Sequence, residues 1–359
     1  MRVCFPVRIA VLSGVAVFVN GCVCLRVSDA TWNWLWKTQS QTDELRARAD
    51  AGKAEWQYVL GYSLLTGEGV AANTGEGIAW LRKSGEGGYV KAQSLLSQIY
   101  LKGRSDVPKS ESEAARWLEK AARQGDVASQ SGLGALYLSK ESSAHDPEAG
   151  VVWFKRAAAA GDLPAQLALG AMYHKGVVVA QNDEESVRWY RLAAGQGQVE
   201  GQTQLGIAYY RGKGVAQSFD EALRLFRLAA AQGGAKAMSN LGVMAGRGEG
   251  VPKDEAQAVA WFRQAADLGD DDGQSNLGAA YYRGIGVVEN YAEALKWFRA
   301  AADQGHSMAQ FRLGYMYALG HGVAADQGKA AEWIGKSAAQ GNPLAAKWLQ
   351  EMAGPKKKE

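Results

Sequence analysis

The first feature that could do chemistry is a row of arginines and amides. Arginines recur 36 residues apart at Arg211, Arg247 and Arg283. An amide precedes each arginine by seven residues, at Gln204, Asn240 and Asn276. Positions seven apart share one face of a helix, so the six side chains predict a stripe that binds a carboxylate-bearing or extended partner. The alternative is a solvated polar face, in which the arginine stems only cover apolar surface.

No other set of residues predicts catalysis, a metal site or a bound cofactor. The four histidines are far apart, and none forms an i, i+4 pair or an H-E-x-x-H motif. Glycine-rich stretches such as Gly212-Lys213-Gly214 resemble phosphate loops, but they follow predicted helices and lack the P-loop frame. The three cysteines, Cys4, Cys22 and Cys24, all lie near the N-terminus. The body of the chain therefore has neither a thiol nucleophile nor a cysteine-based zinc site.

Composition narrows the classes of function. The chain has 359 residues, with 40 basic and 37 acidic side chains and a formal net charge of +3. This balance creates no large field of one sign, which disfavours nucleic acid as the main partner. Glycine is abundant at 44 residues, but the 7 prolines exclude a collagen-like chain. Hydrophobic residues make up 47% of the sequence, so composition does not indicate disorder.

The elements that must position the arginines and amides are copies of one unit. Leu-Gly pairs, tryptophans and single glycines each recur every 36 or 37 residues, in a constant phase. The Leu-Gly pairs are Leu60-Gly61, Leu133-Gly134, Leu169-Gly170, Leu205-Gly206, Leu241-Gly242, Leu277-Gly278 and Leu313-Gly314. The tryptophans are Trp80, Trp117, Trp153, Trp189, Trp261, Trp297 and Trp333, and Leu225 takes this position in the fifth copy. Three markers in phase predict eight repeats over roughly residues 53–341.

Each copy predicts two helices. In the fourth copy, residues 163–176 place apolar side chains on one face and end at Gly176, which suits a left-handed C-cap. Acidic residues then open a second helix, over residues 184–197. The glycine of each Leu-Gly pair predicts a close approach of the two helices, with the tryptophan of the second helix in the adjacent space. A glutamine that recurs in the first helices predicts hydrogen bonds between repeats.

The repeat resembles the Sel1-like repeat, a relative of the tetratricopeptide repeat. The resemblance is clearest at Ala309-Gln310, Leu313-Gly314, Tyr317, Gly320, Gly322-Val323, Trp333, Ala338-Ala339 and Gln340-Gly341. It implies an all-α, right-handed α-solenoid of about eight two-helix repeats, with a half-repeat cap at each end, that organises protein complexes. Residues 43–353 would form the solenoid and residues 354–359 a basic tail. The third repeat, 126–161, lacks the glycine turn, so its turn is expected to differ in shape.

The N-terminus resembles an export signal. Arg2 and Arg8 precede an apolar run that begins at Ile9, as in secretory signals. The following Val19-Asn20-Gly21-Cys22 resembles the bacterial lipoprotein box. Residues 1–21 are then a signal sequence, Cys22 is the predicted lipidation site, and residues 22–42 form a tether. An uncleaved membrane anchor over residues 9–25, plain secretion and a cytoplasmic chain are the alternatives.

Together these features predict an exported, lipid-anchored scaffold on the periplasmic or cell-surface side of a bacterial membrane. It would bind another protein on its concave face and the membrane through its N-terminal lipid or anchor. No enzymatic activity, metal, small-molecule cofactor or nucleic acid is expected. One alternative is a module that binds cell-wall peptidoglycan or glycan, for which Tyr282 and Tyr315 are candidate groove aromatics. The other is a β-lactamase-type hydrolase, which the lack of cysteines in the repeats disfavours.

Overall fold

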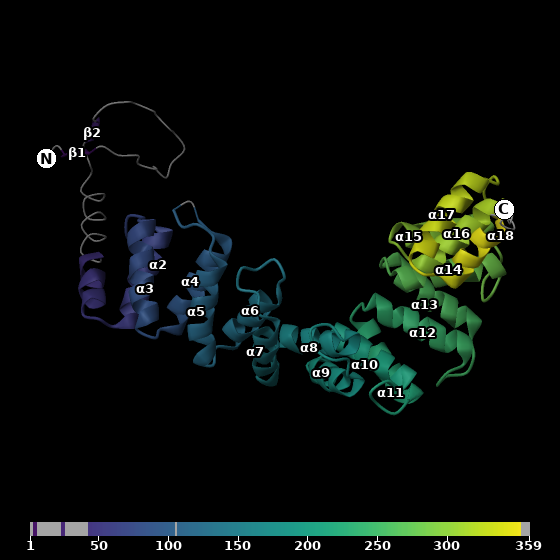
Figure 1. Cartoon of the computed structure of the whole chain (residues 1–359), viewed down its shortest axis with the longest axis horizontal. Coiled ribbons are helices and arrows are strands. Elements are labelled where there is room, and N and C mark those ends of the chain that lie inside the picture. Colours follow the sequence, from purple (N-terminus) through teal and green to yellow (C-terminus); the bar gives the residue numbers. More distant parts are fainter. Residues whose placement is uncertain (1–2, 6–22, 26–41, 105, 353–359) are drawn as a thin grey trace, which may run out of the picture. The chain divides into compact units, whose positions relative to one another are not determined.

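The computed structural model describes residues 3–5, 23–25, 42–104 and 106–352, and the repeats form helix after helix in pairs (Figure 1). The chain divides into two compact units, Met1–Trp153 and Phe154–Glu359, with the boundary inside helix α7. The predicted all-α solenoid is confirmed. We call the first helix of each repeat its leading helix and the second its trailing helix.

The repeats account for helices α2 to α17, and a single helix flanks them at each end. The first unit contains a helix over residues 42–50, then α2 (Ala54–Thr66), α3 (Thr74–Glu86), α4 (Val90–Lys102), α5 (Glu111–Arg123), α6 (Val127–Leu138) and the start of α7 (Pro147–Ala159). The second unit contains α8 (Leu163–Lys175), α9 (Asp183–Gly195), α10 (Val199–Arg211), α11 (Phe219–Ala231), α12 (Ala235–Arg247), α13 (Glu255–Asp267), α14 (Asp271–Arg283), α15 (Tyr291–Asp303), α16 (Ser307–Leu319), α17 (Gln327–Ala339) and α18 (Pro343–Met352). The helix over 42–50 and α18 occupy the positions of the predicted caps.

Short polar residues and glycines set the ends of these helices. Trailing helices begin after a residue such as Asn182 or Ser218, whose side chain accepts a hydrogen bond from the backbone N–H three residues later. Most leading helices end at a left-handed glycine, such as Gly212 at φ 64°. In the fourth repeat Val178 has φ 69°, at the turn position that Gly214 fills in the next repeat. A β-branched residue rarely adopts this conformation, so the turn at Val178 is strained.

The glycine of the Leu-Gly pairs lies where two helices approach closely, but the tryptophan is not the side chain beside it. In the seventh repeat, a Cβ on Gly278 would lie 2.7 Å from the ring of Phe298, the residue after Trp297. The same contact pairs Gly170 with Tyr190, Gly206 with Phe226, Gly242 with Phe262 and Gly314 with Ile334. The prediction that tryptophan fills this space is therefore wrong. One step along a helix turns the side chain by about 100°, which directs Phe298 at its own leading helix.

In the first unit, a tryptophan instead packs against the preceding repeat. A Cβ on Gly85, in trailing helix α3, would lie 2.7 Å from the ring of Trp117, in trailing helix α5. Trp117 is only 1% exposed. Its ring thus joins two successive trailing helices.

The recurrent glutamine of the leading helices forms hydrogen bonds between repeats, as predicted. Gln310 Nε2 donates to the carbonyl of Ala302 in the preceding repeat (3.2 Å), and Gln310 Oε1 accepts from Gln340 Nε2 of its own repeat (2.9 Å). The same arrangement joins Gln93 with Gln124, Gln166 with Gln196, and Gln274 with Gln304. The sixth repeat lacks both glutamines and has Met238 and Leu268 at these positions.

The turn of the third repeat differs from the others, as expected. Helix α6 ends at Ser139, whose φ of −68° and ψ of 119° are extended rather than left-handed. Ser142 is buried in the turn, and its Oγ accepts a hydrogen bond from the Ala144 N–H (3.1 Å). A serine side chain thus stabilises the turn that glycine forms in other repeats.

The N-terminal predictions fall largely on residues that the structure does not describe. Two short strands, β1 (Val3–Phe5) and β2 (Val23–Leu25), pair antiparallel outside the repeats. Cys22, most of the predicted signal sequence and tether, and the tail 354–359 lie outside the described residues. No helix in the described part of the chain is long and apolar enough to cross a membrane.

Candidate functional site

The six residues predicted to bind a partner lie on α10, α12 and α14, the leading helices of repeats five to seven. We call them the arginine–amide row. The arginines are the last residues of their helices, each is exposed, and each precedes a left-handed glycine. A positive charge there also interacts favourably with the helix dipole. The amides lie two turns earlier and are half-buried: the row consists of Gln204, Arg211, Asn240, Arg247, Asn276 and Arg283.

Two of the amides of the row bond to their own helices rather than to the arginines. Gln204 Nε2 donates to Glu200 Oε1 (2.6 Å), and Asn240 Nδ2 donates to the Lys236 carbonyl (2.7 Å). Among the described residues, no hydrogen bond joins an amide of the row to an arginine of the row. The arginines are therefore the side chains of the row best placed to meet a ligand.

Arg247, although exposed, is paired with groups of its own chain. Its Nη1 donates to the Tyr210 hydroxyl (2.9 Å) and lies 3.9 Å from Glu249 Oε1. Tyr210 in turn donates to Glu249 Oε2 (2.6 Å). Burial, and then the hydrogen bond to Glu249, raises the pKa of Tyr210. The phenol thus remains a hydrogen-bond donor at neutral pH, and the three groups form a closed network.

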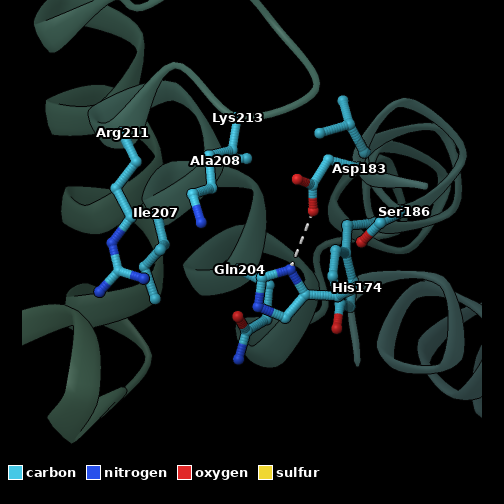
Figure 2. Close-up of a pocket in the computed structure, with 10 residues that line it drawn as sticks. His174, Asp183, Ser186, Gln204, Ile207, Ala208, Arg211 and Lys213 are labelled. Carbon is cyan, nitrogen blue, oxygen red and sulfur yellow. Dashed lines mark hydrogen bonds and ion pairs between the residues drawn. The ribbon is translucent and has the colours of Figure 1, made fainter. Parts of the chain in front are cut away.

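Arg211 and Gln204 line a pocket formed by repeats four and five (Figure 2). His174 Nδ1 lies 3.3 Å from Asp183 Oδ1 in this pocket, which Lys213 also lines. Arg211 and Lys213 are exposed, and neither forms an ion pair with another residue that the structure describes. The rim of the pocket therefore has two exposed cations that form no ion pair with a described residue.

The pocket also contains the residue types of a hydrolytic triad, but not its geometry. Ser186 lines it together with His174 and Asp183. Ser186 Oγ is buried and donates to the Gly170 carbonyl (2.8 Å), and no hydrogen bond within the described residues joins it to His174. A serine nucleophile must direct its proton at the base. The arrangement therefore does not support hydrolysis.

The acidic run Asp270–Asp272 has structural partners. Asp270 caps α14 and accepts a hydrogen bond from Ser239 on the preceding leading helix, α12. Asp272 Oδ1 lies 3.3 Å from His306 Nε2. The hydrogen bond to His306 lowers the pKa of Asp272 below its usual value. These contacts explain the run as a helix cap and as bonds that join α14 to the neighbouring leading helices, α12 and α16.

One arginine beside the row was not among the predicted binding residues. Arg312, on α16, occupies the position that an amide fills in repeats five to seven, so the repeat spacing could have identified it. It is half-buried, and its Nη1 donates to the Ser275 carbonyl (3.3 Å). Its Cζ lies 5.6 Å from the centroid of the Phe298 ring. Arg283, at the end of the preceding leading helix, contributes a second positive charge to this region.

The two tyrosines considered for a glycan-binding groove have different environments. Tyr282 is engaged: its hydroxyl lies 3.0 Å from His321 Nδ1, and its ring centroid lies 6.4 Å from that of Phe298. Tyr315 is 38% exposed and stacks on Phe311. Only Tyr315 is therefore open to a ligand, and no specific contact favours a glycan site.

Comparison with known families gives one match that spans the whole solenoid. The Sel1 repeat is found eight times in succession, at residues 54–89, 90–126, 127–162, 163–198, 199–234, 235–270, 271–306 and 307–342. The chain belongs to the Sel1 repeat family. A Sel1 repeat solenoid suggests a scaffold for protein–protein interaction and is typically not an enzyme.

The solved structures that resemble this Sel1 repeat chain include the following two. A Sel1 repeat protein from Oxalobacter formigenes is 35% identical with a TM-score of 0.74, over 95% of this chain and 97% of that protein. A protective antigen present in uropathogenic Escherichia coli strains is 32% identical with a TM-score of 0.66, over 85% of this chain. The match covers 65% of the antigen, so this chain spans less than two thirds of its length. No curated protein matches the chain.

Proposed function

We propose that this chain is an exported scaffold that binds another protein along the arginine–amide row, with a lipid on Cys22 that attaches it to a membrane. The observation that carries the binding proposal is that Arg211 and Arg283 are exposed and form no ion pair with another described residue. The two arginines occupy equivalent positions two repeats apart. Hydrogen bonds from arginine to carboxylates are among the stronger polar contacts. Unpaired arginines on leading helices therefore suit an acidic stretch of a partner.

The spacing of the row favours an extended partner over a small molecule. The same side chain returns on each leading helix from α10 to α14, so equivalent contacts recur from repeat to repeat. A small ligand would touch one repeat or two, whereas a protein segment can contact all three. Repeat solenoids present extended surfaces of this kind.

Differential capture tests the binding face. The tagged full chain is used to capture proteins from membranes, together with a row variant in which Arg211, Arg247 and Arg283 are alanine. The matched control replaces Arg191, Arg227 and Arg263, which recur at the same 36-residue spacing on trailing helices and are also exposed. We expect mass spectrometry to find a partner that the wild type and the control retain and the row variant loses.

Calorimetry with the purified partner then measures the effect. A charge-assisted hydrogen bond contributes about 1.5–3 kcal/mol. Loss of the row should therefore weaken binding by about 3 kcal/mol or more, which is roughly a hundredfold or greater change in Kd. The melting temperature should hardly change, because surface substitutions usually stay within about 0.5 kcal/mol. Full affinity with an intact fold would place the binding site on another surface.

The lipid part of the proposal rests on the sequence Val19-Asn20-Gly21-Cys22 and on the signal-like residues before it. A relative is described as a protective antigen, and exposure outside the cell would suit an antigen. Intact-mass analysis should find a mature chain that starts at an acylated Cys22, and Cys22→Ala should abolish both acylation and cleavage. Several acyl chains hold a protein firmly at a membrane, whereas one does so only marginally. An unmodified Cys22, or a different mature start, would refute lipidation and leave export to be tested separately.

A further inference from the structure

Two arginines at the C-terminal end of the row, Arg283 and Arg312, form no ion pair with another described residue. Arg312 is half-buried between α14 and α15, and the hydrogen-bond acceptors of its Nη1 are the carbonyl (3.3 Å) and the hydroxyl (3.4 Å) of Ser275, both neutral. Its guanidinium also lies over the neutral ring of Phe298. Neither Arg312 nor Arg283 forms an ion pair in the part of the chain that the structure describes. Burying a charge without a counterion is unfavourable, so this arrangement suits a site whose anion comes from elsewhere.

The electrostatics agree with this geometry. Burial, followed by the positive charge of Arg283, lowers the pKa of Arg312. Tyr282, which precedes Arg283, contributes a neutral hydroxyl bonded to His321, and burial raises the pKa of Tyr282. The groups that Arg312 contacts are thus neutral and its charged neighbour is Arg283, whereas Glu289 acts on the adjacent Tyr282 and forms no ion pair with either arginine among the described residues.

The sixth repeat shows how the same position is neutralised internally. There Arg247 is followed two residues later by Glu249, which accepts a hydrogen bond from Tyr210 and lies beside the guanidinium. In the seventh repeat the residue two positions after Arg283 is Ile285, which is 41% exposed. The repeat that presents a second arginine therefore has an exposed aliphatic residue where the preceding repeat supplies its own carboxylate.

We propose that Arg283 and Arg312 form an anion site that receives a carboxylate side chain from an acidic segment of the partner protein. The inference rests on the proposed function and specifies the chemistry of the partner. Two guanidinium groups can donate several hydrogen bonds to one planar carboxylate. An acidic protein segment suits the site better than a free anion, because the row continues toward the N-terminus with the unpaired Arg211.

The test uses the full chain and a fluorescent oligoglutamate peptide, with binding followed by anisotropy. Arg283→Gln, Arg312→Gln and Ile285→Glu should each lower the affinity about tenfold or more, since each removes a guanidinium or supplies an internal carboxylate. Arg227→Gln is the matched control, because it removes another exposed arginine, on a trailing helix, and it should bind like the wild type. Circular dichroism checks the fold. Arg283 and Ile285 are exposed, so their variants test the site even where loss of Arg312 disturbs packing.

Unchanged peptide affinity in Arg283→Gln and Ile285→Glu would overturn the proposal. Inorganic phosphate is the second probe: if it binds at the two arginines at least as tightly as the peptide, the site accepts small anions and the assignment to an acidic segment is wrong. The outcome is separable from the proposed function. If a partner is lost in the row variant but the peptide binds these variants as tightly as the wild type, only the proposal of the anion site is wrong. If the row variant retains every partner, the proposed binding face fails, whatever the peptide does.

Discussion

The glutamine pair in the eighth repeat gives a prediction whose size follows from its hydrogen bonds. Gln310 is 6% exposed, and its amide donates to the Ala302 carbonyl and accepts from Gln340. The sixth repeat has Met238 at the equivalent position, so Gln310→Met is a substitution that the fold already tolerates elsewhere. It removes two hydrogen bonds, each with a net contribution of about 0.5–1.5 kcal/mol. We expect it to lower the free energy of unfolding of this region by about 2 kcal/mol.

The partner residue allows the shared bond to be isolated. Gln340→Leu, which copies Leu268 of the sixth repeat, removes the bond to Gln310 and a bond to the Gly305 carbonyl (2.9 Å). It should cost about 1–2 kcal/mol. The double variant loses the shared bond only once, so its cost should be smaller than the sum of the single costs by about 1 kcal/mol.

The measurement combines urea denaturation with amide hydrogen exchange in α16 and α17. Exchange is needed because the stability of a repeat array is partly local. Gln264→Met is the control, since Gln264 is an exposed glutamine on α13, and it should change stability by less than about 0.5 kcal/mol. If the two single costs add to the cost of the double variant within about 0.5 kcal/mol, the glutamines do not act as a pair and the reasoning is refuted.

Three further results are expected. Val178→Gly should raise the melting temperature by relieving the left-handed strain at φ 69°, with a net gain of about 1 kcal/mol; an unchanged or lower value would contradict the strain. Phe298→Ala should lower the free energy of unfolding, measured by urea denaturation, by about 3–5 kcal/mol, because Phe298 is 1% exposed and packs on Gly278. Trp297→Ala should lower it less, because Trp297 is only half-buried. A larger loss for Trp297→Ala would indicate that the tryptophan, and not Phe298, makes the main contact between the helices. Asp272 has a lowered pKa in the folded state, so the stability that it contributes is present above about pH 4 and is lost as the pH falls through the folded pKa. The Asp272→Asn variant should therefore lose less stability than the wild type over that pH range. Equal losses of stability in the two proteins on acid titration would contradict this.

The sequence by itself determined the repeats, the helix pairs and the ends of the helices. These features depend on local chemistry that recurs every 36 residues, such as a side-chain cap at Asn182 and a left-handed glycine at Gly212. The bond between Gln310 and the preceding repeat was also predictable, because a buried polar side chain that recurs in each unit needs a partner that recurs with it. The exposed positions of the row followed from the same periodicity.

Only the tertiary structure decided which neighbours these residues meet. Trp297 and Phe298 are adjacent and both apolar, so the spacing could not tell which of them faces Gly278; a rotation of about 100° between neighbours decides it. The arginines of the row are equivalent in sequence, yet Arg247 meets the Tyr210 hydroxyl of the preceding repeat and Arg283 lies near Arg312 of the next. Such pairings join residues about one repeat apart, and their charge balance depends on how successive helices stack. That stacking, which no single repeat specifies, separates the neutralised arginine from those that can receive an anion.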